Sequence, residues 1–142
     1  MTDTPLTDSH VKAWARALRL TEDVRQDIET ALKSAGLPPL LWYDLLLELD
    51  RAGPNGLRPF QLQSEMLIRQ YNLSRLLSRV VKAGYATREE CDSDGRGQIV
   101  RITDAGRTVK DAMWPIYRAA LEKSFAARLS EADAARLLRL LS

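Results

Sequence analysis

The chain has 142 residues, which is the length of one compact domain, and its 45% hydrophobic and 28% charged residues are typical of a globular protein. It contains neither an apolar run of about 20 residues nor a basic-then-apolar leader, so we expect a cytoplasmic protein. Cys91 and His10 are the only cysteine and histidine, which excludes an internal disulfide and a clustered zinc site. We therefore expect no metal and no cofactor.

The net charge of +2 is too small to indicate a nucleic-acid partner by itself, but the charge is unevenly distributed. Residues 68–110 carry nine basic and five acidic side chains, so the rest of the chain is slightly negative. The search for an anionic partner therefore centres on this segment.

The first third of the chain is predicted to be helical. A polar arm, residues 1–9, precedes apolar residues at near-helical spacing from Val11 to Leu32, and the Gly-Leu-Pro-Pro sequence at 36–39 ends this helix. A second helix with Trp42 and Leu49 ends at the turn 53–56.

A helix-turn-helix is predicted next. Pro59 opens a short third helix, a tight turn follows at 67–69, and a fourth helix carries an apolar stripe. The stripe consists of Leu73, Leu76, Leu77 and Val80, and the opposite, polar face consists of Tyr71, Asn72, Ser74, Arg75, Ser78, Arg79 and Lys82. Arginine, asparagine and small hydroxyl side chains suit the DNA major groove, although a solvated surface helix has a similar face.

A β-hairpin is predicted after the fourth helix. Segments 85–91 and 98–103 are the two strands, and the loop between them places Arg96 between two glycines. A flexible tip can carry a guanidinium into the minor groove, and a solvated turn residue is the alternative. Because the hairpin directly follows a helix-turn-helix, we interpret it as a wing.

The remaining residues are predicted to be helical again. Thr103 is expected to cap a long helix that Pro115 kinks, and a short leucine-rich helix follows Ser130. The apolar side chains of so short a helix need another apolar surface to cover them. The predicted fold class is mainly α, with a small β wing.

Several local sequences resemble the MarR (multiple-antibiotic-resistance regulator) family of winged-helix proteins, and the resemblance covers nearly the whole chain. The most specific segments are 72–79 with 83–85, and 92–98 with 102–107. The resemblance implies one MarR-like domain, 1–142, with dimerisation helices at 10–36 and 104–142 and a DNA-binding lobe at 40–103.

The resemblance also implies a recognition helix from about Arg69 to Ala83, with Ser74 and Arg75 at DNA-contact positions and Arg96 at the wing tip. Helical geometry adds Gln70, Tyr71, Asn72, Ser78 and Arg79 as candidates, and phosphate contacts are expected from Arg75, Arg79, Lys82 and Arg88. Arg69, Gln70 and Gly95 depart from the commonest family pattern, which affects the base preference.

Many members of the family are released from DNA by a small aromatic or phenolic ligand or by cysteine oxidation. Trp14, Trp42 and Tyr43, together with Trp114, are candidates to line a ligand crevice, and a plain core role is the alternative. The acidic neighbours of Cys91 disfavour its thiolate, which favours a structural role for this residue.

No motif in the chain indicates an enzyme. We interpret the protein as a transcriptional regulator, a repressor, that binds a pseudo-palindromic site on double-stranded DNA as a homodimer. One alternative is a winged-helix protein-interaction module, for which Tyr71 is the obvious apolar anchor. Another is a ligand-binding helical bundle without a DNA target.

Overall fold

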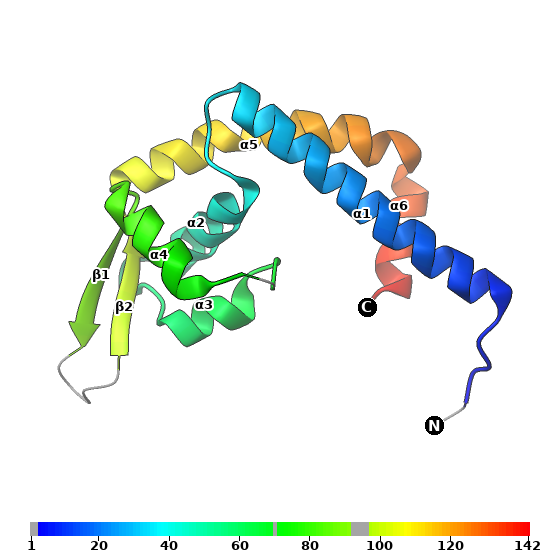
Figure 1. Cartoon of the computed structure of the whole chain (residues 1–142), viewed down its shortest axis with the longest axis horizontal. Helices are drawn as coiled ribbons and strands as arrows, with labels where there is room; N and C mark the ends of the chain where they lie inside the picture. Colours follow the sequence, from blue (N-terminus) through cyan, green and yellow to red (C-terminus); the bar gives the residue numbers. More distant parts are fainter. Residues whose placement is uncertain (1–2, 70, 92–96) are drawn as a thin grey trace.

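The computed structural model describes residues 3–69, 71–91 and 97–142. Figure 1 shows a winged lobe, which contains the hairpin, at one side and the two chain ends at the other, with long helices connecting them. The mainly α fold class with a two-stranded wing is confirmed.

The long helix α1 spans Asp8–Ser34. Its N-terminus is closed by a capping box, in which the Thr7 hydroxyl accepts a hydrogen bond from the His10 amide and the His10 ring accepts one from the Thr7 amide. Only the C-terminal half of α1 is buried, through Val24, Ile28 and Leu32. These side chains pack with residues of α2 and α5, including Tyr43 and Met113.

The winged lobe has its own hydrophobic core. It is built from α2 (Leu40–Ala52), the 3-10 turn η1 (Gly53–Asn55), α3 (Pro59–Glu65), α4 (Leu73–Lys82) and the hairpin. Leu45, Leu46 and Leu49 of α2 pack against Leu62 of α3, against Leu76, Leu77 and Val80 of α4, and against Val100 of the hairpin. The predicted apolar stripe of the fourth helix therefore faces this core, as expected.

The fourth helix is shorter than the predicted recognition helix, which was expected to begin near Arg69. It begins at Leu73, because the Asn72 side chain accepts a hydrogen bond from the Arg75 amide and caps the helix. It ends with a Schellman motif, in which Gly84 has a φ of 85° and the Tyr85 amide donates to the Val80 carbonyl over 3.1 Å.

The hairpin consists of antiparallel strands β1 (Ala86–Cys91) and β2 (Gly97–Ile102). Ala86, Val100 and Ile102 are buried on the face toward the lobe core. Arg101 ties the hairpin to η1, since its Nε donates to the Pro54 carbonyl over 2.8 Å.

Helix α5 (Asp104–Ser124) runs from the lobe toward the far side of the molecule and packs along α1 (Figure 1). Thr103 caps it as predicted, and Pro115 lies inside it. The 3-10 turn η2 (Ala126–Arg128) leads to α6 (Glu131–Leu140), whose N-cap is Ser130, also as predicted. No helix within the described ranges is long and apolar enough to cross a membrane.

Candidate nucleic-acid interface

The outer face of α4 is polar and basic. Its exposed residues are Ser74, Arg75, Ser78, Arg79 and Lys82. The buried residues Leu76, Leu77 and Val80 fix the rotation of the helix, so these five side chains all point away from the lobe core. The Ser78 hydroxyl donates to the Ser74 carbonyl over 3.0 Å, which turns it back onto the helix.

The cations on α4 differ in their pairing from Arg101, Arg107 and Lys110, which come later in the basic segment. Within the described ranges, no carboxylate forms an ion pair with Arg75, Arg79 or Lys82. By contrast, Arg101 pairs with an acidic side chain on the hairpin, and Arg107 and Lys110 pair with Asp50. Arg101, Arg107 and Lys110 are therefore held in ion pairs within the chain, whereas the three cations on α4 are available to an anionic partner.

The segment before α4 does not continue the predicted polar helix face. Tyr71 precedes the helix, is half-buried and packs against the lobe core, so the prediction that it belongs to the exposed face was wrong. Its hydroxyl is buried without a hydrogen-bond partner among the described residues. Burial, and next the charge of Asp44, raise the pKa of Tyr71 above its usual value.

The remaining predicted DNA-contact residue that the structure describes is Arg88, which lies on strand β1 of the hairpin. Arg88 is paired with Val100 across the hairpin and therefore lies on the inward face of the sheet. Its Nε and Nη2 atoms are buried and have no hydrogen-bond partner among the described residues. The predicted contacts of Gln70 and Arg96 lie outside the described residues.

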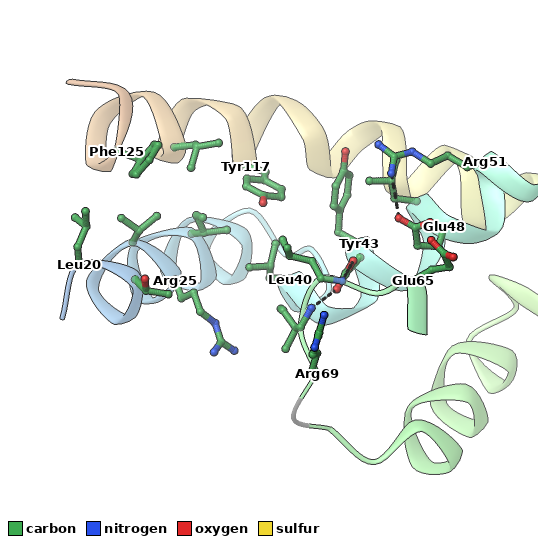
Figure 2. A pocket seen from close by; sticks show the side chains of 18 residues that line it. Leu20, Arg25, Leu40, Tyr43, Glu48, Arg51, Glu65, Arg69, Tyr117 and Phe125 are labelled. Carbon is green, nitrogen blue, oxygen red and sulfur yellow. Dashed lines mark hydrogen bonds and ion pairs between the residues drawn. The ribbon is translucent and has the colours of Figure 1, made fainter. Parts of the chain in front are cut away.

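A cavity of about 840 Å³ lies between α1, α2, α5 and the turn that precedes α4. In Figure 2, Leu20 and Arg25 line it from α1, Tyr43 from α2, Tyr117 from α5, and Phe125 from the position just after α5. Of the four aromatic residues predicted for a crevice, only Tyr43 lines this cavity, and the Trp114 ring stacks against the Tyr43 ring with the centroids 6.1 Å apart.

The other two predicted crevice residues were misplaced, for separate reasons. Trp42 faces the opposite side of α2, where its ring meets Tyr85 edge-on with the centroids 6.0 Å apart. Trp14 lies in the outer half of α1 and is 67% exposed. Successive residues of an α-helix point about 100° apart, so the adjacent side chains of Trp42 and Tyr43 lie on different sides of α2.

The cavity is apolar with a charged rim. Arg25, Arg51 and Arg69 bring cationic groups to it, and Arg51 pairs with Glu48 over 3.0 Å (Figure 2). Burial raises the pKa of Tyr43 and of Tyr117 above the usual value for tyrosine. Both phenols are therefore neutral hydrogen-bond donors at physiological pH.

A second hollow of about 950 Å³ follows the groove between α1 and α5, and the sequence did not indicate it. Small side chains, including Ala31, Ala119 and Ala120, form part of its floor. Separately from this hollow, large apolar side chains are exposed on the N-terminal half of α1 and at the C-terminal end of the chain, in and just after α6. They are Val11, Trp14, Leu18, Leu138, Leu140 and Leu141.

Two acidic residues with structural roles were also missed. Asp44 is buried, and its carboxylate accepts hydrogen bonds from the Leu67 and Ile68 amides. Asp50 binds Lys110 and Arg107 of α5. The only signal in the sequence was that each carboxylate lies in or beside the apolar run of α2, which cannot reveal partners on distant segments.

A helix-turn-helix whose second helix is followed by a two-stranded hairpin defines the class of winged helix-turn-helix proteins. Residues 35–97, which span this lobe up to the start of β2, match the sequence model of the MarR family. A search of curated proteins found no match.

Solved structures extend the similarity over the whole chain. AbsC, a MarR family transcriptional regulator from Streptomyces coelicolor, is 25% identical with a TM-score of 0.81, over 99% of this chain and 94% of its own. Sco3205 from the same organism, solved in complex with DNA, is 26% identical with a TM-score of 0.85, over 99% and 88%. A mutant MarR from E. coli complexed with operator DNA is 17% identical with a TM-score of 0.77, over 97% and 96%.

The chain is therefore similar to the MarR family in the sequence of residues 35–97 and in the fold of nearly its whole length, as its sequence indicated. Members of this family are transcription regulators, which agrees with the expectation that the chain is not an enzyme.

Proposed function

We propose that the protein binds double-stranded DNA as a homodimer and represses transcription from a pseudo-palindromic operator. The observation that carries the proposal is the group of cations on α4, Arg75, Arg79 and Lys82, which are exposed and have no ion-pair partner among the described residues. Two of the structural relatives were solved with DNA, which supports this assignment.

In the proposed complex, α4 enters the major groove. Ser74 and Arg75 lie in its first turn and contact base edges, with Gln70 and the Asn72 cap near the groove entrance. Ser78, Arg79 and Lys82 follow along the helix, where the two cations bind phosphates. Arg96 of the wing enters the minor groove, and Arg88 supports the wing from its inward face.

The homodimer is supported by the apolar residues of α1 and α6, which are exposed in the single chain. Trp14 is 67% exposed, and Leu138 and Leu141 are 70% and 77% exposed. Large apolar side chains exposed in this number on the two terminal helices favour an interaction surface. A second chain would cover it and would complete the dimerisation region proposed at 10–36 and 104–142, apart from the DNA-binding lobe at 40–103.

The cavity beside Tyr43 and Tyr117 supports release by a small aromatic or phenolic effector, because it is large enough for such a ligand and is lined mainly by apolar groups. Phenol and benzoate are suitable first probes. Weaker DNA binding with either probe, and no such effect in a Leu121→Trp variant that narrows the cavity, would support this role.

The decisive experiment is fluorescence anisotropy with duplexes from the protein's own upstream region and a scrambled duplex as control, at two salt concentrations. Selective, salt-sensitive binding that Arg75→Glu abolishes is the expected result. Absence of binding at low salt would favour the protein-interaction module. The half-buried position of Tyr71 weakens that alternative, although Phe60 and Leu67 are exposed apolar side chains of the lobe.

A further inference from the structure

Asp44 is the only charged residue in the described ranges that is buried, with 7% of its surface exposed. It lies in the middle of α2, and its partners lie more than twenty positions away, in the turn between α3 and α4. Its Oδ1 accepts a hydrogen bond from the Leu67 amide over 3.1 Å, and its Oδ2 accepts one from the Ile68 amide over 2.9 Å.

The chemistry of the turn explains why a carboxylate is needed there. Helix α3 ends at Glu65, and Met66 takes an extended conformation, so the next two amides have no helical carbonyl to bind. A carboxylate offers two acceptor oxygens, and its burial is tolerated only when such donors compensate it. Asp44 therefore attaches the turn to α2 at one position, four residues before the Asn72 cap of α4.

The same residues form part of the cavity wall. Asp44, Leu67, Ile68 and Arg69 all line the cavity, as do Tyr117 of α5 and Phe125 just after that helix. Figure 2 shows Arg69 at the cavity on the segment that leads to α4. A ligand in the cavity would therefore lie beside Asp44 and the turn that precedes α4.

We propose that Asp44 is a positioning residue that couples the cavity to α4. Its carboxylate holds the turn, and with it the start of the helix, in one register. A ligand that bears a hydrogen-bond donor competes for this carboxylate, loosens the turn and shifts α4. The ligand must be a donor, because an ionised carboxylate only accepts hydrogen bonds.

The first test is amide hydrogen exchange, resolved by residue, in the wild type and in Asp44→Asn. Asparagine keeps the shape but replaces one acceptor with a donor that faces an amide. We expect exchange at Leu67 and Ile68 to accelerate by about tenfold, with smaller changes at the start of α4 and none in the α2 core.

The matched control is Glu48→Gln, since Glu48 also lies on α2 and lines the cavity but binds Arg51 instead of the turn. Its exchange at Leu67 and Ile68 should stay within about twofold of the wild type. Unchanged exchange in Asp44→Asn, or equal acceleration along the whole chain, would overturn the proposal.

A second test uses the wild-type protein and remains valid if Asp44→Asn does not fold. Phenol, a hydrogen-bond donor, and benzoate, which has only acceptors at neutral pH, are titrated at concentrations that leave the circular dichroism unchanged. Phenol should accelerate exchange at Leu67 and Ile68, and benzoate should not. Equal effects of the two probes, or no effect of phenol, would contradict the coupling.

The consequence for DNA rests on the proposed function and is measured separately. Asp44→Asn should lower affinity for the selected duplex by about tenfold and affinity for a scrambled duplex by less than about twofold. If the wild type shows no selective binding, the proposed function fails, while the exchange experiments still decide the role of Asp44. If selective binding is unchanged in Asp44→Asn, the turn does not position α4 for DNA.

Discussion

The amino group of Lys110 on α5 contacts the carboxylate of Asp50 on α2, which joins the winged lobe to the long helix that leaves it. Arg107, one turn earlier on α5, approaches the same carboxylate to 3.4 Å. Lys110 is also 3.1 Å from Asp111, so its ammonium lies between two carboxylates. This cluster fixes the angle between the lobe and α5.

The first prediction concerns stability at acidic pH. The hydrogen bond from Lys110 is the main cause that holds the pKa of Asp50 below its usual value. A depressed native pKa means that this stabilisation is present above the unfolded pKa and is lost as the pH falls below about 4. Asp50→Asn should lower the free energy of unfolding at neutral pH by about 1–2 kcal/mol. Urea titrations at several pH values should also show that the free energy of unfolding of this variant falls less steeply between about pH 5 and pH 3. An unchanged fall would refute the assignment.

The second prediction concerns alkaline pH. Burial raises the pKa of Tyr43 and of Tyr117. At Lys110, burial lowers the pKa, but hydrogen bonds to Asp50 and Asp111 outweigh it and raise the pKa overall. A group whose pKa is higher in the folded protein than in the unfolded chain stabilises the fold fully at pH values below its unfolded pKa. This stabilisation is lost as the pH rises through the pKa of the folded protein. Stability should therefore decline above about pH 10, and less steeply in Tyr117→Phe, as measured by denaturant unfolding and ultraviolet difference titration.

The third prediction separates phosphate contacts from other surface charges. Arg79→Gln should reduce the slope of log affinity against log salt concentration by about one unit per subunit, because one phosphate contact is lost in each half-site. Arg118→Gln is the matched control, since Arg118 is exposed on α5 and pairs with Glu122. Equal salt slopes for Arg79→Gln and the wild type would exclude Arg79 from the interface.

The fourth prediction concerns the close contact at the start of α5. A Cβ atom on Gly106 would overlap the Tyr85 carbonyl oxygen and come within 2.8 Å of the Ile102 side chain. Gly106→Ala should therefore lower the free energy of unfolding by about 1–3 kcal/mol, although alanine favours helices. The control Ala105→Gly, at the exposed neighbouring position, should cost only about 0.5–1 kcal/mol. A stabilised Gly106→Ala protein in thermal unfolding would contradict this packing.

The fifth prediction tests the proposed dimer. A chain that lacks residues 130–142 loses α6 and the exposed leucines on it, so it should sediment as a monomer or aggregate. The control Arg136→Gln changes an exposed polar position of the same helix and should retain the dimer. Sedimentation of the truncated chain as an intact dimer would show that α6 is dispensable for association.

The sequence alone was sufficient for features that depend on local patterns. The capping residues Thr103 and Ser130, the apolar stripe of α4 and the helix stop at Gly84 all follow from spacing and backbone preferences, and the structure has each of them. The resemblance to the MarR family was evident for the same reason, because the segments that carry it are continuous in the chain.

Tertiary structure decided the features that join distant segments. Helix α4 begins at Leu73 and not near Arg69, because Asn72 caps it and because Asp44 attaches the turn before it to α2 through two amides. Trp42 and Tyr43 are adjacent in the chain but face different cores. A helix stripe shows which residues are buried, but the partner that covers them depends on how helices far apart in the sequence pack together.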